Sequence, residues 1–164
     1  MKTKKLVLNI FALLGLVLLI LPMFLAMYAP SIIANGEITK LFTIKIFGDW
    51  GLAQPDNLFF ATLTDIFAVV MLCFAATYLV LFILQLLNVG KDKTLNKVKK
   101  LLAVLTLILT ILSVATFVVF AVSNTTTSDF IKTTSTVLPQ AGSILMVVGG
   151  LVFSVFGMVA SKKK

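Results

Sequence analysis

Apolar residues fill four long runs of this chain, and polar segments separate them. A helix rises about 1.5 Å per residue, so ~20 apolar residues are needed to cross a hydrocarbon core of about 30 Å. Each run reaches that length, and Asp65 is the one formally charged residue inside the runs. The pattern predicts an all-α membrane protein, a bundle of four transmembrane helices, folded as a single domain over residues 1–164.

We expect helices at about residues 6–28, 58–88, 101–122 and 139–160, outer loops at 29–57 and 123–138, and an inner loop at 89–100. The lysines support this topology. Eleven of the 14, with the single acid Asp92, lie before the first run, between the second and third, and after the fourth, for a net charge of +10. The outer loops carry three lysines and four acids, a net of −1, and Asp65 completes the total of +8.

Lysine and arginine accumulate on the cytoplasmic side of membrane proteins. Both termini should therefore be cytoplasmic, in a multi-pass protein of the plasma membrane. Because the positive charge is explained by topology, we expect no nucleic-acid partner, and the lysine-rich inner edge would suit anionic lipid. The use of lysine without any arginine, with much Ile, Phe and Asn, suggests a low-GC bacterium.

The first outer loop has the pattern of a β-hairpin. Residues 32–34 lead into Asn35-Gly36, which tolerates the positive φ of a type I′ turn, and alternating residues follow over 37–47. Trp50 is predicted to be an interfacial anchor, with a binding hot spot as the alternative. The β-branched residues of the second outer loop allow a short strand that joins the hairpin, or an irregular loop. We expect a small extracytoplasmic β-hairpin or sheet.

The sequence lacks the residues that most catalytic and metal sites need. It has no histidine, one cysteine and no glycine-rich phosphate loop, and no second acid lies within a run to work with Asp65. One cysteine cannot form an intramolecular disulfide or a cysteine-based metal cluster. We therefore expect no enzyme activity, no cofactor and no metal site.

Asp65 is the first candidate functional residue, because an ionised carboxylate in hydrocarbon is costly. It could be a proton or cation site or a contact to a basic partner. Alternatively, it lies near the interface, hydrated or bound by loop backbone. Thr106, Thr110 and Ser113 share one face of the third helix, where they could form a polar seam within the bundle or line a water-filled path.

The fourth helix carries small residues at spacings that let two helix backbones approach closely. They are Gly142, Gly149, Gly150, Ser154, Gly157 and Ser161. This stripe should pack against helix 1 or helix 2, since the four helices must first pack with one another, or it meets another protein.

The layout, with both ends cytoplasmic and a longer first outer loop of β character, resembles the claudin-like tetraspan proteins. Trp50-Gly51-Leu52 echoes the Gly-Leu-Trp motif of that family, although Ala53 stands where the second Trp would be and the two cysteines do not follow. The resemblance implies a four-span architecture, and barrier function is not carried over.

These features together predict a non-catalytic membrane accessory, scaffold or assembly subunit of a larger complex. Its partners would be the lipid bilayer and another membrane protein, or a second copy of the chain. The alternative is a small transporter or channel, alone or as an oligomer, with Asp65 as its cation or proton site.

Overall fold

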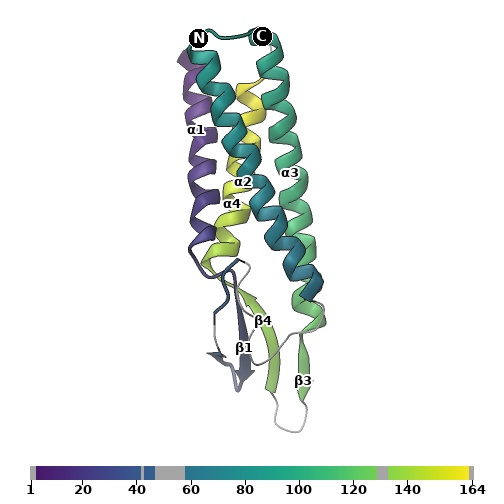
Figure 1. Cartoon of the computed structure of the whole chain (residues 1–164). Helices are drawn as coiled ribbons and strands as arrows, with labels where there is room; N and C mark the ends of the chain where they lie inside the picture. The colour runs from purple at the N-terminus through teal and green to yellow at the C-terminus, as the bar shows by residue number, and fades with distance from the viewer. Residues whose placement is uncertain (1–2, 42, 47–57, 129–132, 163–164) are drawn as a thin grey trace.

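The computed structural model describes residues 3–41, 43–46, 58–128 and 133–162, and in this part of the chain four helices stand side by side with a small sheet at one end (Figure 1). The helices are α1 (Thr3–Ile20), α2 (Leu58–Leu86), α3 (Asp92–Ser123) and α4 (Ala141–Ala160). By length and composition, all four could cross a membrane. This part of the prediction is confirmed. Trp50 lies outside the described residues.

The helices form a closed ring in chain order, because α1 contacts α2 and α4, and α3 contacts the same two helices. Buried apolar side chains from several helices fill the centre of the ring, including Ala68, Met71, Ala75, Met146 and Phe153. The outer faces are apolar as well, with exposed Val, Ile and Leu along every helix. A helix that is apolar all round is typical of a membrane span.

α1 ends earlier than predicted. A 3-10 turn, η1 (Leu21–Met23), follows Ile20, and Tyr28, predicted as the last helical residue, opens the first strand. Pro22 explains the change, because proline has no N–H to continue the helical hydrogen bonds and its ring crowds the preceding turn.

α2 ends within two residues of its predicted end, in a Schellman motif. The Val89 N–H donates to the Leu84 carbonyl (2.9 Å), and the Asn88 N–H donates to the Gln85 carbonyl (3.3 Å). Asn88 has a φ of 56°, the left-handed conformation that this motif requires at its first non-helical position. The motif turns the chain sharply toward α3.

α3 begins at Asp92, much earlier than predicted. Its acidic first residue suits the positive end of the helix dipole. Residues 92–100, assigned to the inner loop, are instead the first turns of α3. The polar character of this segment hid its helical conformation, because polar residues extend the helix beyond the apolar run.

Strands from both outer segments form one antiparallel sheet in the described residues, in the order β2-β1-β4-β3. They are β1 (Tyr28–Ala34), β2 (Glu37–Lys40), β3 (Thr126–Ser128) and β4 (Thr133–Pro139). Asn35 (φ 50°) and Gly36 (φ 84°) make the turn between β1 and β2, as predicted. β4 pairs with β1 along its whole length. The irregular-loop alternative for the second outer segment is therefore wrong.

The sheet also departs from the predicted hairpin in extent. β2 stops at Lys40, and Ile44 then returns to form an isolated bridge with Tyr28. The first residues of β1 are consequently bonded on both sides, by Ile44 and by the end of β4. This anchors the sheet where the chain leaves α1.

α1 and α4 pack backbone against backbone at Gly15. A Cβ atom at Gly15 would lie 2.5 Å from the backbone nitrogen of Phe153 and 2.7 Å from its Cα. At the same interface, a Cβ at Gly149 would lie 2.9 Å from the Leu18 Cβ. Small residues on both helices therefore permit this close approach, and Gly15 was not among the predicted packing residues.

Candidate functional site

A buried carboxylate lies where the helices meet the sheet. Asp65 of α2 is 2% exposed and accepts a hydrogen bond from the Tyr28 hydroxyl of β1 (3.1 Å). The Tyr28 ring stacks on Phe117, with 5.6 Å between ring centroids, and meets Phe120 edge-on at 5.8 Å; both belong to α3. One tyrosine thus joins the sheet to two helices.

Two threonine hydroxyls lie beside this contact. The Thr64 and Thr116 hydroxyl oxygens are 2.8 Å apart, and the Thr64 hydroxyl donates to the Phe60 carbonyl (2.9 Å). We call Tyr28, Asp65, Thr64 and Thr116 the sheet-end cluster. Burial, and then the negative charge of Asp65, raises the pKa of Tyr28 above its usual range. The phenol therefore stays protonated and remains a donor to Asp65.

The predicted hydroxyl face of α3 is bonded to its own backbone. Thr106 donates to the Leu102 carbonyl (2.9 Å), Thr110 to the Thr106 carbonyl (2.8 Å) and Ser113 to the Leu109 carbonyl (2.8 Å). All three side chains are buried. Such i−4 bonds satisfy a hydroxyl without water, so this geometry corresponds to a polar seam between packed helices.

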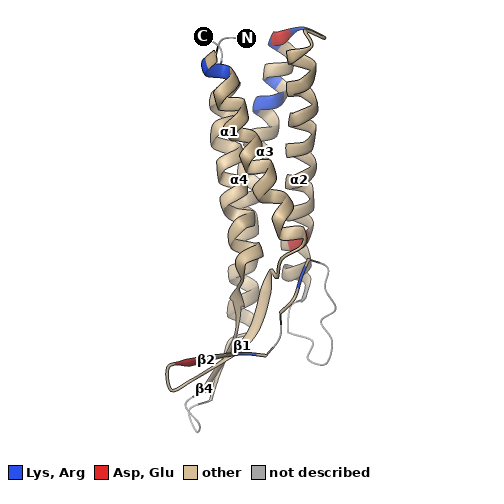
Figure 2. Cartoon of the chain, turned by 90° about the vertical axis from the view of Figure 1, so that its left-hand side faces the viewer, with Lys and Arg blue, Asp and Glu red and all other residues tan. Residues whose placement is uncertain are grey.

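A second buried polar cluster occupies the opposite end of the bundle. Lys99 of α3 is 0% exposed, and its Nζ donates to Asn9 Oδ1 of α1 (2.6 Å) and to Gln85 Oε1 of α2 (3.1 Å). The Tyr78 hydroxyl also donates to Asn9 Oδ1 (2.8 Å). We call Asn9, Tyr78, Gln85 and Lys99 the lysine-end cluster, because it lies at the lysine-rich end of the bundle (Figure 2).

Aromatic faces complete the surroundings of Lys99. Its Nζ lies 4.7 Å from the centre of the Tyr78 ring and 5.3 Å from that of Phe82. Among the described residues no carboxylate is within ion-pair distance of Lys99. Amide oxygens and ring faces therefore take the place of a counter-ion, as a buried cation requires.

Sequence reasoning missed this cluster because it placed Lys99 in the inner loop as a topological charge. The early start of α3 moves that residue inside the bundle. A signal was present, since Asn9 and Gln85 are polar residues within the first and second apolar runs and both lie near the lysine-rich end. Extending the third helix back through the lysines would have brought the three together.

The small residues of α4 lie against α1, the first of the two predicted partners, and also against α3, which was not predicted. A Cβ at Gly150 would overlap the Thr110 hydroxyl of α3. At Gly157 a Cβ would lie 3.1 Å from the Ala103 Cβ of α3, with Tyr78 of α2 reaching in at 3.3 Å. α2 and α4 lie diagonally across the ring and make few contacts with each other.

The remaining members of the stripe occupy distinct places. Gly142 donates its N–H to the Ala26 carbonyl (2.9 Å), which ties the start of α4 to the segment before β1. Ser154 donates to the Gly150 carbonyl within α4 (2.6 Å). Ser161, just after the helix, is buried, and its hydroxyl has no hydrogen-bond partner in the described residues.

Comparison with protein-family models, curated proteins and solved structures found no match for this chain. The claudin-like resemblance stays a prediction. Within the described residues, no three His, Cys, Asp or Glu side chains are grouped so that they could hold a metal ion. The two buried polar clusters are thus the candidate sites, one at each end of an apolar bundle.

Proposed function

We propose that this chain is a non-catalytic subunit of the plasma membrane of a low-GC bacterium, which helps to assemble or hold together a larger membrane complex. Its four apolar helices would span the bilayer. The lysines gather at the end of the bundle where both termini lie, and the sheet is at the other end (Figure 2). The positive-inside bias then puts the termini in the cytoplasm and the sheet outside.

The rigid attachment of the sheet to the bundle is the observation that carries this proposal. The Tyr28–Asp65 bond joins β1 to α2, and the Gln140 N–H donates to the Met27 carbonyl (3.1 Å) at the start of α4. The hairpin of β1 and β2 extends beyond the bundle (Figure 2), and Ile38 of β2 is 57% exposed. A small surface held at a fixed height above the membrane suits recognition of a partner.

The chemistry of that partner follows from the hairpin. Ile38 and the exposed Leu41 are apolar, and Glu37 and Lys40 beside them carry opposite charges. A strand edge with such side chains can pair with a strand of another protein, where backbone bonds supply affinity and side chains supply specificity. We infer that the partner is another membrane protein, or a second copy of the chain, with an extended segment outside the membrane.

Transport by a single chain has less support from the packing. The two polar clusters are separated by the buried apolar side chains of the ring, and the α3 hydroxyls between them bond their own helix. A continuous route for an ion would need polar groups or water along this length. The packing therefore favours an architectural role over the transporter alternative.

A photo-crosslinking amino acid at Ile38, used in intact cells, tests the proposal. Ile111, which is 60% exposed on α3, provides a matched control of the same residue type facing outward from the bundle. We expect a discrete protein adduct from position 38 and none from position 111. Absence of a protein adduct at position 38 would oppose the assembly role.

The transporter alternative is tested on the purified chain, reconstituted alone in vesicles. We expect proton and cation flux no greater than through empty vesicles. Flux by the wild type that Asp65→Asn abolishes, with the variant still folded, would replace the assembly role with transport.

A further inference from the structure

A basic groove opens at the lysine-rich end, between the first turns of α3 and the end of α4. It encloses a cavity of about 500 Å³ lined by Lys93, Asn96, Lys97, Lys100, Ser161 and Lys162. This volume falls within the roughly 300–1,000 Å³ typical of small-molecule sites. Four of its six lining residues are lysines, and none is acidic, so an anion is the ligand that its charge favours.

Ser161 provides an independent sign of a ligand. Its side chain is 5% exposed and lines the groove, yet its hydroxyl has no hydrogen-bond partner in the described residues. The Tyr78 hydroxyl is a near neighbour of Ser161, but its proton is already donated to Asn9 Oδ1 (2.8 Å). Buried hydroxyls normally have a hydrogen-bond partner, so an acceptor group that enters the groove would accept the hydrogen bond that the Ser161 hydroxyl can donate.

The acid nearest to the groove along α3 is engaged elsewhere. Asp92 accepts a hydrogen bond from Gln85 Nε2 of α2 (3.2 Å). Lys99, buried on α3 between the exposed Lys97 and Lys100 in sequence, adds another cation to this end of the bundle. The end of α4 brings the negative end of its helix dipole and the start of α3 brings the positive end. These two dipole contributions oppose each other, so the lysines make the electrostatic potential of the groove positive.

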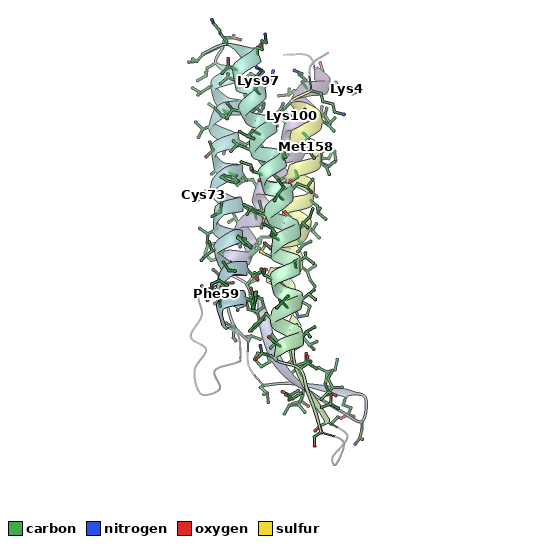
Figure 3. The ribbon with its side chains drawn as sticks, turned by 90° about the vertical axis from the view of Figure 1, so that its right-hand side faces the viewer. Lys4, Phe59, Cys73, Lys97, Lys100 and Met158 are labelled. Carbon is green, nitrogen blue, oxygen red and sulfur yellow. The ribbon has the colours of Figure 1, made fainter. Side chains whose placement is uncertain are left out.

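Apolar residues follow the groove-lining residues along α3 and α4 toward the middle of the bundle. Figure 3 shows Met158 of α4 below Lys100, on the side away from the lysine-rich end. Val104 lies one turn after Lys100 on α3, and both Met158 and Val104 are half-buried. A ligand with an anionic head and an apolar tail would place its head among the lysines and its tail along these apolar residues. This arrangement favours an amphiphile over a free ion.

We propose that the basic groove binds the phosphate of an anionic phospholipid, with its acyl chain lying along Met158 and Val104. Ser161 donates a hydrogen bond to the phosphate, and Lys97, Lys100 and Lys162 neutralise its charge. The inference rests on the membrane location in the proposed function, but it does not depend on the assembly role.

Binding of phosphatidylglycerol to the full chain in detergent micelles, by native mass spectrometry and thermal stability, tests the groove. Phosphatidylcholine is the neutral lipid control, and inorganic phosphate is the free-ion control. We expect retention of phosphatidylglycerol and a rise in melting temperature that neither control produces. Equal stabilisation by inorganic phosphate would overturn the assignment to lipid.

Ser161→Ala separates a ligand role from a packing role. The variant should fold at least as stably without lipid, because it removes a buried hydroxyl that lacks a partner. Its affinity for phosphatidylglycerol should fall about tenfold, the equivalent of one hydrogen bond to a charged group. Unchanged lipid binding in a folded Ser161→Ala protein would refute the site.

Charge variants distinguish a defined groove from general attraction. Lys100→Gln should weaken binding, whereas Lys91→Gln removes the same charge at the same end of the bundle but outside the groove, and should leave binding unchanged. An equal loss in both variants would show diffuse surface attraction and would overturn the proposal. Neither result bears on the crosslinking at Ile38, so failure of the groove and failure of the assembly role are distinguishable.

Discussion

Gly15→Ala should destabilise the protein although alanine is the better helix former. The new Cβ would meet the Phe153 backbone nitrogen at 2.5 Å and its Cα at 2.7 Å, so the two helices must move apart. Overpacking costs about 1–3 kcal/mol, and we take the upper end because backbone atoms cannot rotate away. Higher helix propensity returns about 1 kcal/mol. The net loss is about 2 kcal/mol.

Gly157→Ala is the matched control, at a glycine of α4 that faces α3 and α2. Its Cβ would lie 3.1 Å from the Ala103 Cβ and 3.3 Å from Tyr78 Cε2, contacts that relax with small shifts. A cost near 1 kcal/mol is then offset by a similar gain in helix propensity, about 1 kcal/mol. We expect stability close to that of the wild type.

Size-exclusion chromatography after heating in a mild detergent measures the loss of folded monomer for both variants. A deficit of about 2 kcal/mol should lower the apparent melting temperature of Gly15→Ala by roughly 4–8 °C for a chain of this size. Equal melting temperatures for Gly15→Ala and Gly157→Ala would refute the described α1–α4 interface.

Three further predictions concern the buried clusters and the orientation. Tyr28→Phe should cost about 1.5–3 kcal/mol of stability in the same heating assay, because it removes a hydrogen bond to a charged group. Adding Asp65→Asn should recover part of that loss because the buried charge is gone, and no recovery would contradict the role of this bond. Lys99→Met should lower the stability by about 1–3 kcal/mol, because it leaves the acceptor Gln85 without its donor. Lys97→Met on the exposed face should keep the stability within about 0.5 kcal/mol of the wild type, and equal effects would argue against a buried Lys99. With Cys73 replaced, a cysteine at position 39 should react with an impermeant thiol reagent on intact cells, and a cysteine at position 162 should not. The reverse pattern of labelling would invert the proposed topology.

The sequence by itself determined the features that depend on composition over long stretches. Four apolar runs of sufficient length can satisfy their backbone groups in a membrane as helices, so their number and approximate positions could be predicted. The Asn35-Gly36 turn was also predictable, because few residue pairs accept positive φ at both positions. These signals are local, and no knowledge of neighbouring helices was needed to interpret them.

Tertiary structure alone decided where the polar residues of the runs go. Tyr28 bonds Asp65 only because Pro22 ends α1 early and the chain turns into β1, and the two are 37 positions apart. Lys99 becomes buried because α3 continues through a polar segment that composition marks as a loop. Whether a lysine sets topology or lies inside the bundle depends on the acceptors of other helices, here Asn9 and Gln85, which three-dimensional packing brings within reach of a cation that would otherwise be too costly to bury.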